Sequence, residues 1–214
     1  VWNAARFVLS HASGIAPVRN IRSADLTLPD RWILSRQHRL TEEVTRLIND
    51  WQFGEAGRRI YEFLWGEYCD WYIEISKISL YGKNEAAKAL TCQVLVYVLE
   101  RTLRLLHPFM PFITEELWQH LPHEGEALII APWPEAGPLD EVAEEEMGLV
   151  TEIIRAIRNA RAEYDVPSGR RITTIIVAGG RKPLLKAQKE VLISLARLDE
   201  DGLTIADSLA ENPT

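Results

Sequence analysis

Residues 85–106 read EAAKALTCQVLVYVLERTLRLL, and this stretch decides the fold class. Its apolar residues fall on nearly every side of the helix that the stretch predicts. A helix that is apolar all round is stable in water only where other elements cover it on all sides. The stretch therefore predicts the central helix of an α-helical bundle, and His107 with Pro108 predicts its end.

Other helices are predicted on both sides of this central one. The second helix of the chain is expected to start at Asp30 as its N-cap and to run to about residue 51. Over 55–80, apolar residues recur every three or four positions, which places them on one helical face. The remaining segments are helices over 1–13, 112–121 and 140–164, a linker over 14–29 and an extended, proline-rich connector over 122–139.

The pattern changes after residue 168. Residues 172–177 are β-branched throughout and end before Gly179, which is typical of a strand. A helix over 183–198 and a strand over 203–206 complete one β-α-β unit. The predicted fold class is mainly α, with a helical bundle over 1–168 followed by a small α/β subdomain over 169–214. This subdomain is expected to be incomplete, because two strands are too few for a stable sheet.

The 214 residues carry a net charge of −7, but the charge is unevenly distributed. Segments 1–59 and 155–189 carry +3 and +7, whereas 60–154 and 190–214 carry −12 and −5. Screening confines electric fields to about 8–10 Å, so the two basic segments can still bind phosphate. Two cysteines favour a reducing, intracellular compartment. No apolar run reaches the roughly 20 residues of a membrane span, so no membrane partner is expected.

Catalytic and metal-binding patterns are weak. Gly179–Lys182 lacks the spacing of a phosphate-binding loop, and no serine lies in a nucleophile-elbow context. His120 and His123, near Glu115 and Glu116, are interpreted as surface histidines rather than metal ligands. The acidic run 144–146 is interpreted as a solvated face or as a favourable charge near a helix N-terminus. No catalytic residue and no metal ligand are therefore predicted.

Two groups of residues could bind RNA. Asn3, Arg6 and Phe7 share one helical face and combine an amide for base edges, a guanidinium for phosphate and a ring for stacking. Alternatively, Phe7 is a core residue and Asn3 an ordinary surface residue. The second group, Arg155, Arg158 and Arg161 with Arg170 and Arg171 after them, could follow a phosphate backbone. Alternatively, these arginines are paired with Glu152 and Glu163.

Six blocks of the sequence resemble the region that follows the catalytic core in class I valyl-tRNA synthetases, and they occur in the same order as in that family. Isoleucyl and leucyl enzymes share this group and remain alternatives. Trp-Asn-Ala-Ala-Arg-Phe and Cys-Asp-Trp-Tyr favour the valyl family. The blocks are Trp2–Phe7, Asp30–Arg36, Glu67–Glu74, Leu105–Trp118, Pro132–Pro134 and Ile157–Glu163.

The resemblance implies a domain that binds the anticodon stem and loop of a valine-specific tRNA. In the family, a separate catalytic domain joins valine to tRNA using ATP with magnesium. Its signature motifs do not occur here, so the chain is expected to be a non-catalytic, cofactor-free fragment of a cytoplasmic ligase. It would contact its own catalytic domain, and neither DNA nor membrane.

Two further expectations accompany the resemblance. The recognised aromatics Trp32, Trp71, Phe109, Phe112 and Trp118 are expected in the core. A rival function of another class is a helical protein-interaction module that presents the acidic segment 60–154.

Overall fold

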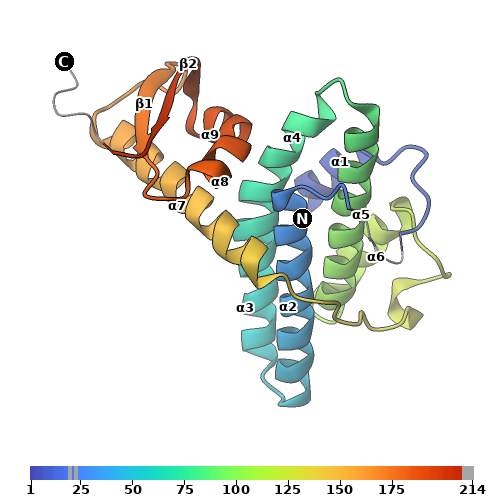
Figure 1. The fold of residues 1–214 in the computed structure, drawn as a ribbon. Helices are drawn as coiled ribbons and strands as arrows, with labels where there is room; N and C mark the ends of the chain where they lie inside the picture. The colour runs from blue at the N-terminus through green and yellow to red at the C-terminus, as the bar shows by residue number, and fades with distance from the viewer. Residues whose placement is uncertain (19–20, 22–23, 209–214) are drawn as a thin grey trace. The chain divides into compact units, whose positions relative to one another are not determined.

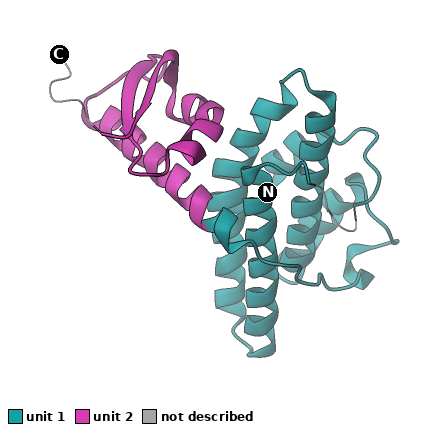
Figure 2. Cartoon of the chain, in the orientation of Figure 1, with its two compact units in different colours: residues 1–144 teal, residues 145–214 magenta. Residues whose placement is uncertain are grey.

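A computed structural model describes residues 1–18, 21 and 24–208. The chain forms two compact units, of which unit 1 comprises residues 1–144 and unit 2 begins at Glu145 (Figure 2). Parts of the predicted linker (19–20 and 22–23) and the end of the predicted α/β subdomain (209–214) lie outside the described residues. No helix in the described part of the chain combines the length and the apolar character that a membrane span requires.

Unit 1 is a helical bundle arranged around α5, Glu85–Leu106 (Figure 1). Asn84 caps the start of this helix by accepting hydrogen bonds from the N–H groups of Ala86 and Ala87. The other elements of unit 1 are α1 (Trp2–His11), α2 (Leu28–Asn49), α3 (Phe53–Phe63), the π-helical stretch η1 (Leu64–Ile73), α4 (Glu74–Leu80), α6 (Pro111–His120) and the short 3-10 helix η2 (Leu128–Ile130). Helix α5 contacts α1, α2, α3, α4 and α6, as expected for the central helix of the bundle.

The start of α2 corrects one prediction. Thr27, and not Asp30, is the N-cap, and Asp30 is the third helical residue of a reciprocal capping box. The Thr27 N–H donates to Asp30 Oδ2 over 3.0 Å, while Asp30 N–H donates to Thr27 Oγ1 over 3.4 Å. Pro29 fits inside the helix because its missing N–H is unneeded in the first turn.

The segment predicted as one helix over 55–80 contains a change of helical geometry. Helix α3 continues into η1, whose turns are wider, and then into α4. Within the wider turns, Trp71, Tyr72 and Ile73 are buried. The predicted inward positions Ile60, Leu64 and Tyr68 are buried.

Three of the five aromatics expected in the core are buried, namely Trp32, Trp71 and Trp118. Phe109 is half-buried. The expectation for Phe112 is wrong, because this side chain is 92% exposed. Helix α6 turns Thr114, Leu117 and Trp118 inward. At about 100° per residue, position 112 points away from that face.

Unit 2 contains the predicted β-α-β unit. Strand β1 (Ile172–Val177) pairs in parallel with β2 (Leu198–Ala206), with Val177 opposite Ala206. Between them, α8 (Lys182–Ala187) and α9 (Lys189–Ala196) replace the single helix expected over 183–198. The second strand begins earlier than expected and contains an irregularity between the pairs Ile172–Leu198 and Thr174–Leu203. The mainly α fold with a small α/β appendage is thus confirmed.

Helix α7 (Glu141–Glu163) begins in unit 1 and continues in unit 2. The division into compact units falls within α7, after Glu144, and the boundary expected at 168/169 stays a prediction. Two arginines of α7 bind backbone carbonyl groups at the end of α9. Arg158 Nε donates to the Leu195 oxygen over 3.0 Å, and Arg161 Nη1 donates to the Arg197 oxygen over 3.4 Å.

Candidate nucleic-acid interface

Helix α1 presents the first predicted group. Ala4, Ala5 and Val8 are buried on one side of this helix. Asn3 and Arg6 are consequently exposed, and Phe7 lies half-buried at the edge of the buried face. The shared helical face that the spacing predicted is therefore accessible, although Phe7 is only partly so.

A surface hollow of about 490 Å³ brings part of this group next to η1 and α4. Asn3 and Phe7 line it from α1, whereas Arg6 does not. A hollow of this size falls in the range that small planar ligands occupy. The remaining lining residues are Val1, Trp2, Ala4, Trp65, Cys69, Asp70, Ile73, Glu74 and Lys77.

Tryptophans supply the accessible aromatic surface of the hollow. Trp2 and Trp65 are 48% and 40% exposed. The ring of Phe7 already has two neighbours, with His11 at 4.7 Å between centroids and Lys77 Nζ at 5.7 Å from the Phe7 centroid. The most accessible stacking surfaces therefore belong to the tryptophans.

Trp65 is also supported from behind. Tyr61 stacks on it, with ring centroids 4.9 Å apart and planes inclined by 16°. Sequence reasoning missed Trp65 as a site residue, although a signal exists. Tyr61 and Trp65 are four residues apart, next to the buried positions Ile60 and Leu64, so two large aromatics share a face outside the core.

The polar groups of the hollow suit base edges better than phosphates. Asp70 and Glu74 are exposed carboxylates, and Lys77 Nζ donates to Glu74 Oε1 over 2.6 Å. Carboxylates repel phosphate but accept hydrogen bonds from the amino groups of bases. Burial raises the pKa of the Cys69 thiol, so this group is neutral near pH 7 and is a poor nucleophile.

The predicted arginines on α7 occupy different environments. Arg155 and Arg158 are exposed, whereas Arg161 is only 8% exposed. The guanidinium of Arg161 donates to three carbonyl oxygens, those of Pro167, Arg170 and Arg197, at 3.1, 2.7 and 3.4 Å. Its hydrogen bonds thus go to backbone oxygens rather than to Glu163, the expected alternative partner.

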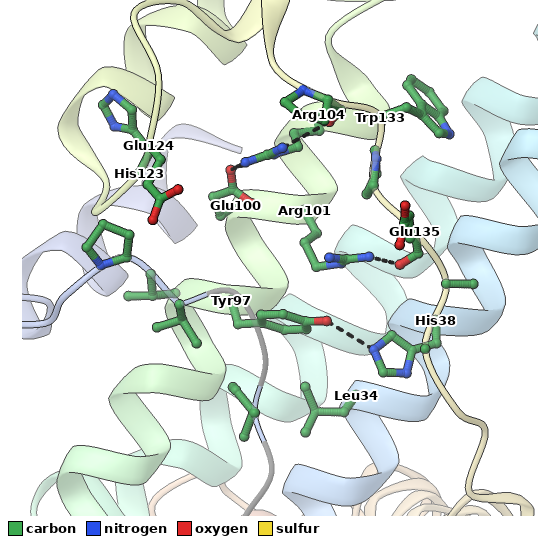
Figure 3. A pocket seen from close by; sticks show the side chains of 18 of the residues that line it. Leu34, His38, Tyr97, Glu100, Arg101, Arg104, His123, Glu124, Trp133 and Glu135 are labelled. Atoms are coloured by element: carbon green, nitrogen blue, oxygen red, sulfur yellow. Dashed lines mark hydrogen bonds and ion pairs between the residues drawn. The ribbon is translucent and has the colours of Figure 1, made fainter.

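Another hollow of unit 1, about 580 Å³, lies between α2, α5 and the proline-rich connector (Figure 3). Its polar side chains bind the connector itself. Arg104 donates to the Pro132 oxygen over 2.9 Å, and Arg101 donates to the Glu135 oxygen. His38 lies 2.9 Å from the Pro138 oxygen and 3.2 Å from the Tyr97 hydroxyl. Burial lowers the pKa of His38, which favours a neutral ring that donates to Pro138 and accepts from Tyr97.

The acidic run on α7 has a structural member. Glu144 accepts hydrogen bonds from Ser35 and from the guanidinium groups of Arg36 and Arg39. Burial alone would raise the pKa of Glu144, but these hydrogen bonds outweigh burial and lower it. This carboxylate therefore joins α7 to α2, which differs from the solvated face expected for the run.

The histidine pair is also engaged in local contacts. His120 Nε2 lies 3.3 Å from Glu116 Oε1, and His123 Nδ1 lies 2.8 Å from the Leu121 oxygen. Across residues 1–18, 21 and 24–208, no three histidine, cysteine or carboxylate side chains are grouped as a metal site would require.

Comparison with known proteins assigns this architecture to a family of domains. The family described as the anticodon-binding domain of tRNA ligase matches residues 30–176. That range contains all of η1 and all of α7 but not α1.

The curated relatives are longer than this chain. The valine–tRNA ligase of Geobacillus stearothermophilus is 51% identical over 178 residues, which cover 82% of this chain and 20% of that protein. Those of Bacillus subtilis and Oceanobacillus iheyensis are 46% and 45% identical over 178 and 205 residues. These matches cover 82% and 95% of this chain, and 20% and 22% of the relatives. The chain therefore spans about a fifth of the length of these relatives.

Proposed function

Because the chain belongs to the family of anticodon-binding domains of tRNA ligases, we propose that it binds the anticodon stem and loop of a valine-accepting tRNA. The hollow beside α1 carries this proposal. It combines accessible indole rings with amide and carboxylate groups, and such mixtures bind unpaired bases in RNA loops.

Each residue of α1 has a distinct role in this proposal. The Asn3 amide hydrogen-bonds a base edge, and Arg6, exposed one turn later, contacts phosphate. Phe7 lines the hollow and is half-buried, and its ring contacts one face or edge of a bound base. Trp2 and Trp65 supply the stacking surfaces, because they are the most accessible rings there.

The arginines of α7 bind the RNA backbone. Arg155 and Arg158 are exposed on this helix and would contact phosphate groups directly. Arg161 would support them from its buried position. Tight binding should accordingly weaken as salt increases, because each phosphate contact releases counterions.

In the whole protein, this region would serve a valine–tRNA ligase, an aminoacyl-tRNA synthetase of protein biosynthesis. A separate catalytic domain would bind ATP with magnesium and join valine to the tRNA, while the present residues supply no catalytic group. Its location would be the cytoplasm, and its partners the tRNA and its own catalytic domain. The relatives described above are valine–tRNA ligases, which favours valine over the isoleucine and leucine alternatives.

The test replaces Phe7 by alanine and measures binding of a valine-accepting tRNA transcript to the chain. We expect a loss of about 1–3 kcal/mol, or roughly 5- to 150-fold in Kd, with little change in thermal stability. Phe112→Ala is the matched control, because Phe112 is more exposed and lies outside the hollow.

Equal affinity of the Phe7→Ala variant and the parent chain would refute the role of the hollow. Capture of a protein partner without RNA, combined with no measurable tRNA binding, would favour the protein-interaction module instead.

A further inference from the structure

Four arginines in unit 2 bind backbone carbonyl groups in one region. We call Arg158, Arg161, Arg171 and Arg197 the arginine cluster. Arg171 Nη1 donates to the Leu198 oxygen over 2.7 Å, and Arg197 donates to the Ser168 oxygen. Together with the bonds of Arg158 and Arg161, these contacts join the end of α7, the loop 165–171 and the start of β2.

Three members of the cluster, Arg161, Arg171 and Arg197, have backbone carbonyl oxygens as hydrogen-bond acceptors. Among residues 1–18, 21 and 24–208, no ion pair involves Arg161, Arg171 or Arg197. The loop contributes the exposed Asp165 and β2 contributes the exposed Asp199, Glu200 and Asp201, and among the described residues none of these four forms an ion pair with the three arginines. Carbonyl oxygens are dipoles and carry no net charge, so these hydrogen bonds do not cancel the charges of the three guanidinium groups.

Two other basic residues of the same unit show the contrast. Arg181 lies 2.7 Å from Glu145, and Lys182 lies 2.6 Å from Asp207. Their charges are each matched by a carboxylate, whereas those of Arg161, Arg171 and Arg197 are not. This difference in pairing between the two sets of basic residues occurs within unit 2, so the overall composition of the chain does not explain it.

A purely structural role accounts for two members of the cluster, Arg158 and Arg161. Arg158 and Arg161 bind the carbonyl oxygens of Leu195 and Arg197, which the end of α9 leaves unsatisfied. Arg171 and Arg197 are exposed, and each uses one nitrogen for its carbonyl bond. A guanidinium has five N–H donors, so both retain donors that can reach an anion.

We propose that the arginine cluster is a binding site for phosphodiester groups of an RNA backbone. Arg171 and Arg197 contact the phosphates, and the exposed Arg170 extends the site. Arg161 is a positioning residue, since its buried guanidinium holds the carbonyl groups of Pro167 and Arg170. The planar fork of a guanidinium matches two phosphate oxygens, which favours phosphate as the ligand.

The inference rests on the proposed function, and its test separates the two. Binding of a valine-accepting tRNA transcript to the 214-residue chain is measured between about 50 and about 200 mM KCl. The variant Arg171→Gln/Arg197→Gln removes two proposed phosphate contacts. The matched control Arg181→Gln/Lys182→Gln removes the same charge from ion-paired positions of the same unit.

We expect the cluster variant to reduce the slope of log K against log salt by about 1.4–1.8, because each contact releases 0.7–0.9 counterions. The control should retain the parent slope. A further variant, Arg171→Lys/Arg197→Lys, keeps the charge and should restore most of the slope. Circular dichroism of each variant, recorded at the binding temperature, distinguishes loss of contact from loss of folding.

Equal slopes for the cluster variant and the control would overturn the inference while leaving tRNA binding by the chain intact. Failure of the lysine variant to restore the slope in a folded protein would also overturn it. Absence of binding by the parent chain at all salt concentrations would refute the proposed function and, with it, the phosphate site.

Discussion

The buried guanidinium of Arg161 donates a hydrogen bond of 2.7 Å to the carbonyl oxygen of Arg170. One basic residue thus holds the backbone of another, nine positions later in the sequence. Arg170 itself is exposed, so this contact presents a second guanidinium to solvent at the end of the loop. The same side chain of Arg161 fixes the loop through Pro167 and the end of α9 through Arg197.

Replacing Arg161 by leucine should destabilise unit 2. Three carbonyl oxygens would lose their donors, and we expect the free energy of unfolding to fall by about 2–4 kcal/mol. Chemical denaturation followed by hydrogen exchange in residues 165–171 measures this loss. Arg170→Leu is the control, because its side chain is exposed and its carbonyl group is retained. Equal stability of the two variants would contradict the structural role of Arg161.

Replacing Tyr72 by phenylalanine should weaken the start of α2. The buried Tyr72 hydroxyl donates to Asp30 Oδ1 over 2.6 Å, and burial raises the pKa of Tyr72, which keeps it a donor. Loss of a hydrogen bond to a buried carboxylate should cost about 1.5–3 kcal/mol. Urea denaturation tests this, with the exposed Tyr61→Phe as the control. An effect no larger than that of the control would show that the capping box does not need Tyr72.

The Glu144→Gln variant should lower stability in a pH-dependent manner. The folded chain lowers the pKa of Glu144 from its ordinary value of 4.5, so its contribution is present above that pH and is lost as pH falls further. We expect a deficit of about 2 kcal/mol at pH 7, because hydrogen bonds to a charged group are lost. Melting curves from pH 7 to about 3 should show the deficit shrinking as carboxylates become protonated.

Glu145→Gln provides the control for this titration. Its ion pair with Arg181 is exposed, with 68% of the Glu145 side chain accessible, and should contribute little. A deficit for Glu144→Gln that stays constant across the pH range would contradict the assigned network.

Two glycine substitutions should act in opposite directions. A Cβ atom at Gly137 would lie 2.5 Å from the His38 ring, so Gly137→Ala should displace the connector and destabilise unit 1 by about 1–3 kcal/mol. A Cβ atom at Gly148 in α7 meets no atom within 4 Å. Gly148→Ala should therefore stabilise the chain by about 0.5–1 kcal/mol through helix propensity. Differential scanning calorimetry of both variants tests the pair, and equal signs would contradict this packing.

Most of the fold could be predicted from the sequence, because periodicity reports which face of an element is buried. The limits of α5 and β1 follow from a continuous apolar stretch and a β-branched run. The errors arose where local chemistry or packing decided the outcome. The Thr27–Asp30 box moved the start of α2, and the wider turns of η1 interrupt the single regular helix expected over 55–80. Phe112 was expected in the core because its side chain is apolar, but its position around the axis of α6 was not considered, and it is exposed.

Less of the candidate site could be predicted. The spacing of Asn3, Arg6 and Phe7 indicated a shared face of α1, but nothing in the sequence indicated that η1 and α4 complete a hollow beside it. Trp65 joins Asn3 only through the tertiary fold. The burial of Arg161 was also unpredictable, because its acceptors are backbone oxygens, which every residue type provides.

The most direct test of the central proposal compares two tRNAs that differ only in the anticodon. Filter binding to the 214-residue chain measures Kd for a valine-accepting tRNA transcript and for the same transcript with its three anticodon bases replaced. We expect the replacement to weaken binding by about tenfold or more, since each base contact contributes about 1–3 kcal/mol. We also expect Trp65→Ala to reduce that difference. Equal Kd values for the two tRNAs would contradict anticodon recognition by this chain.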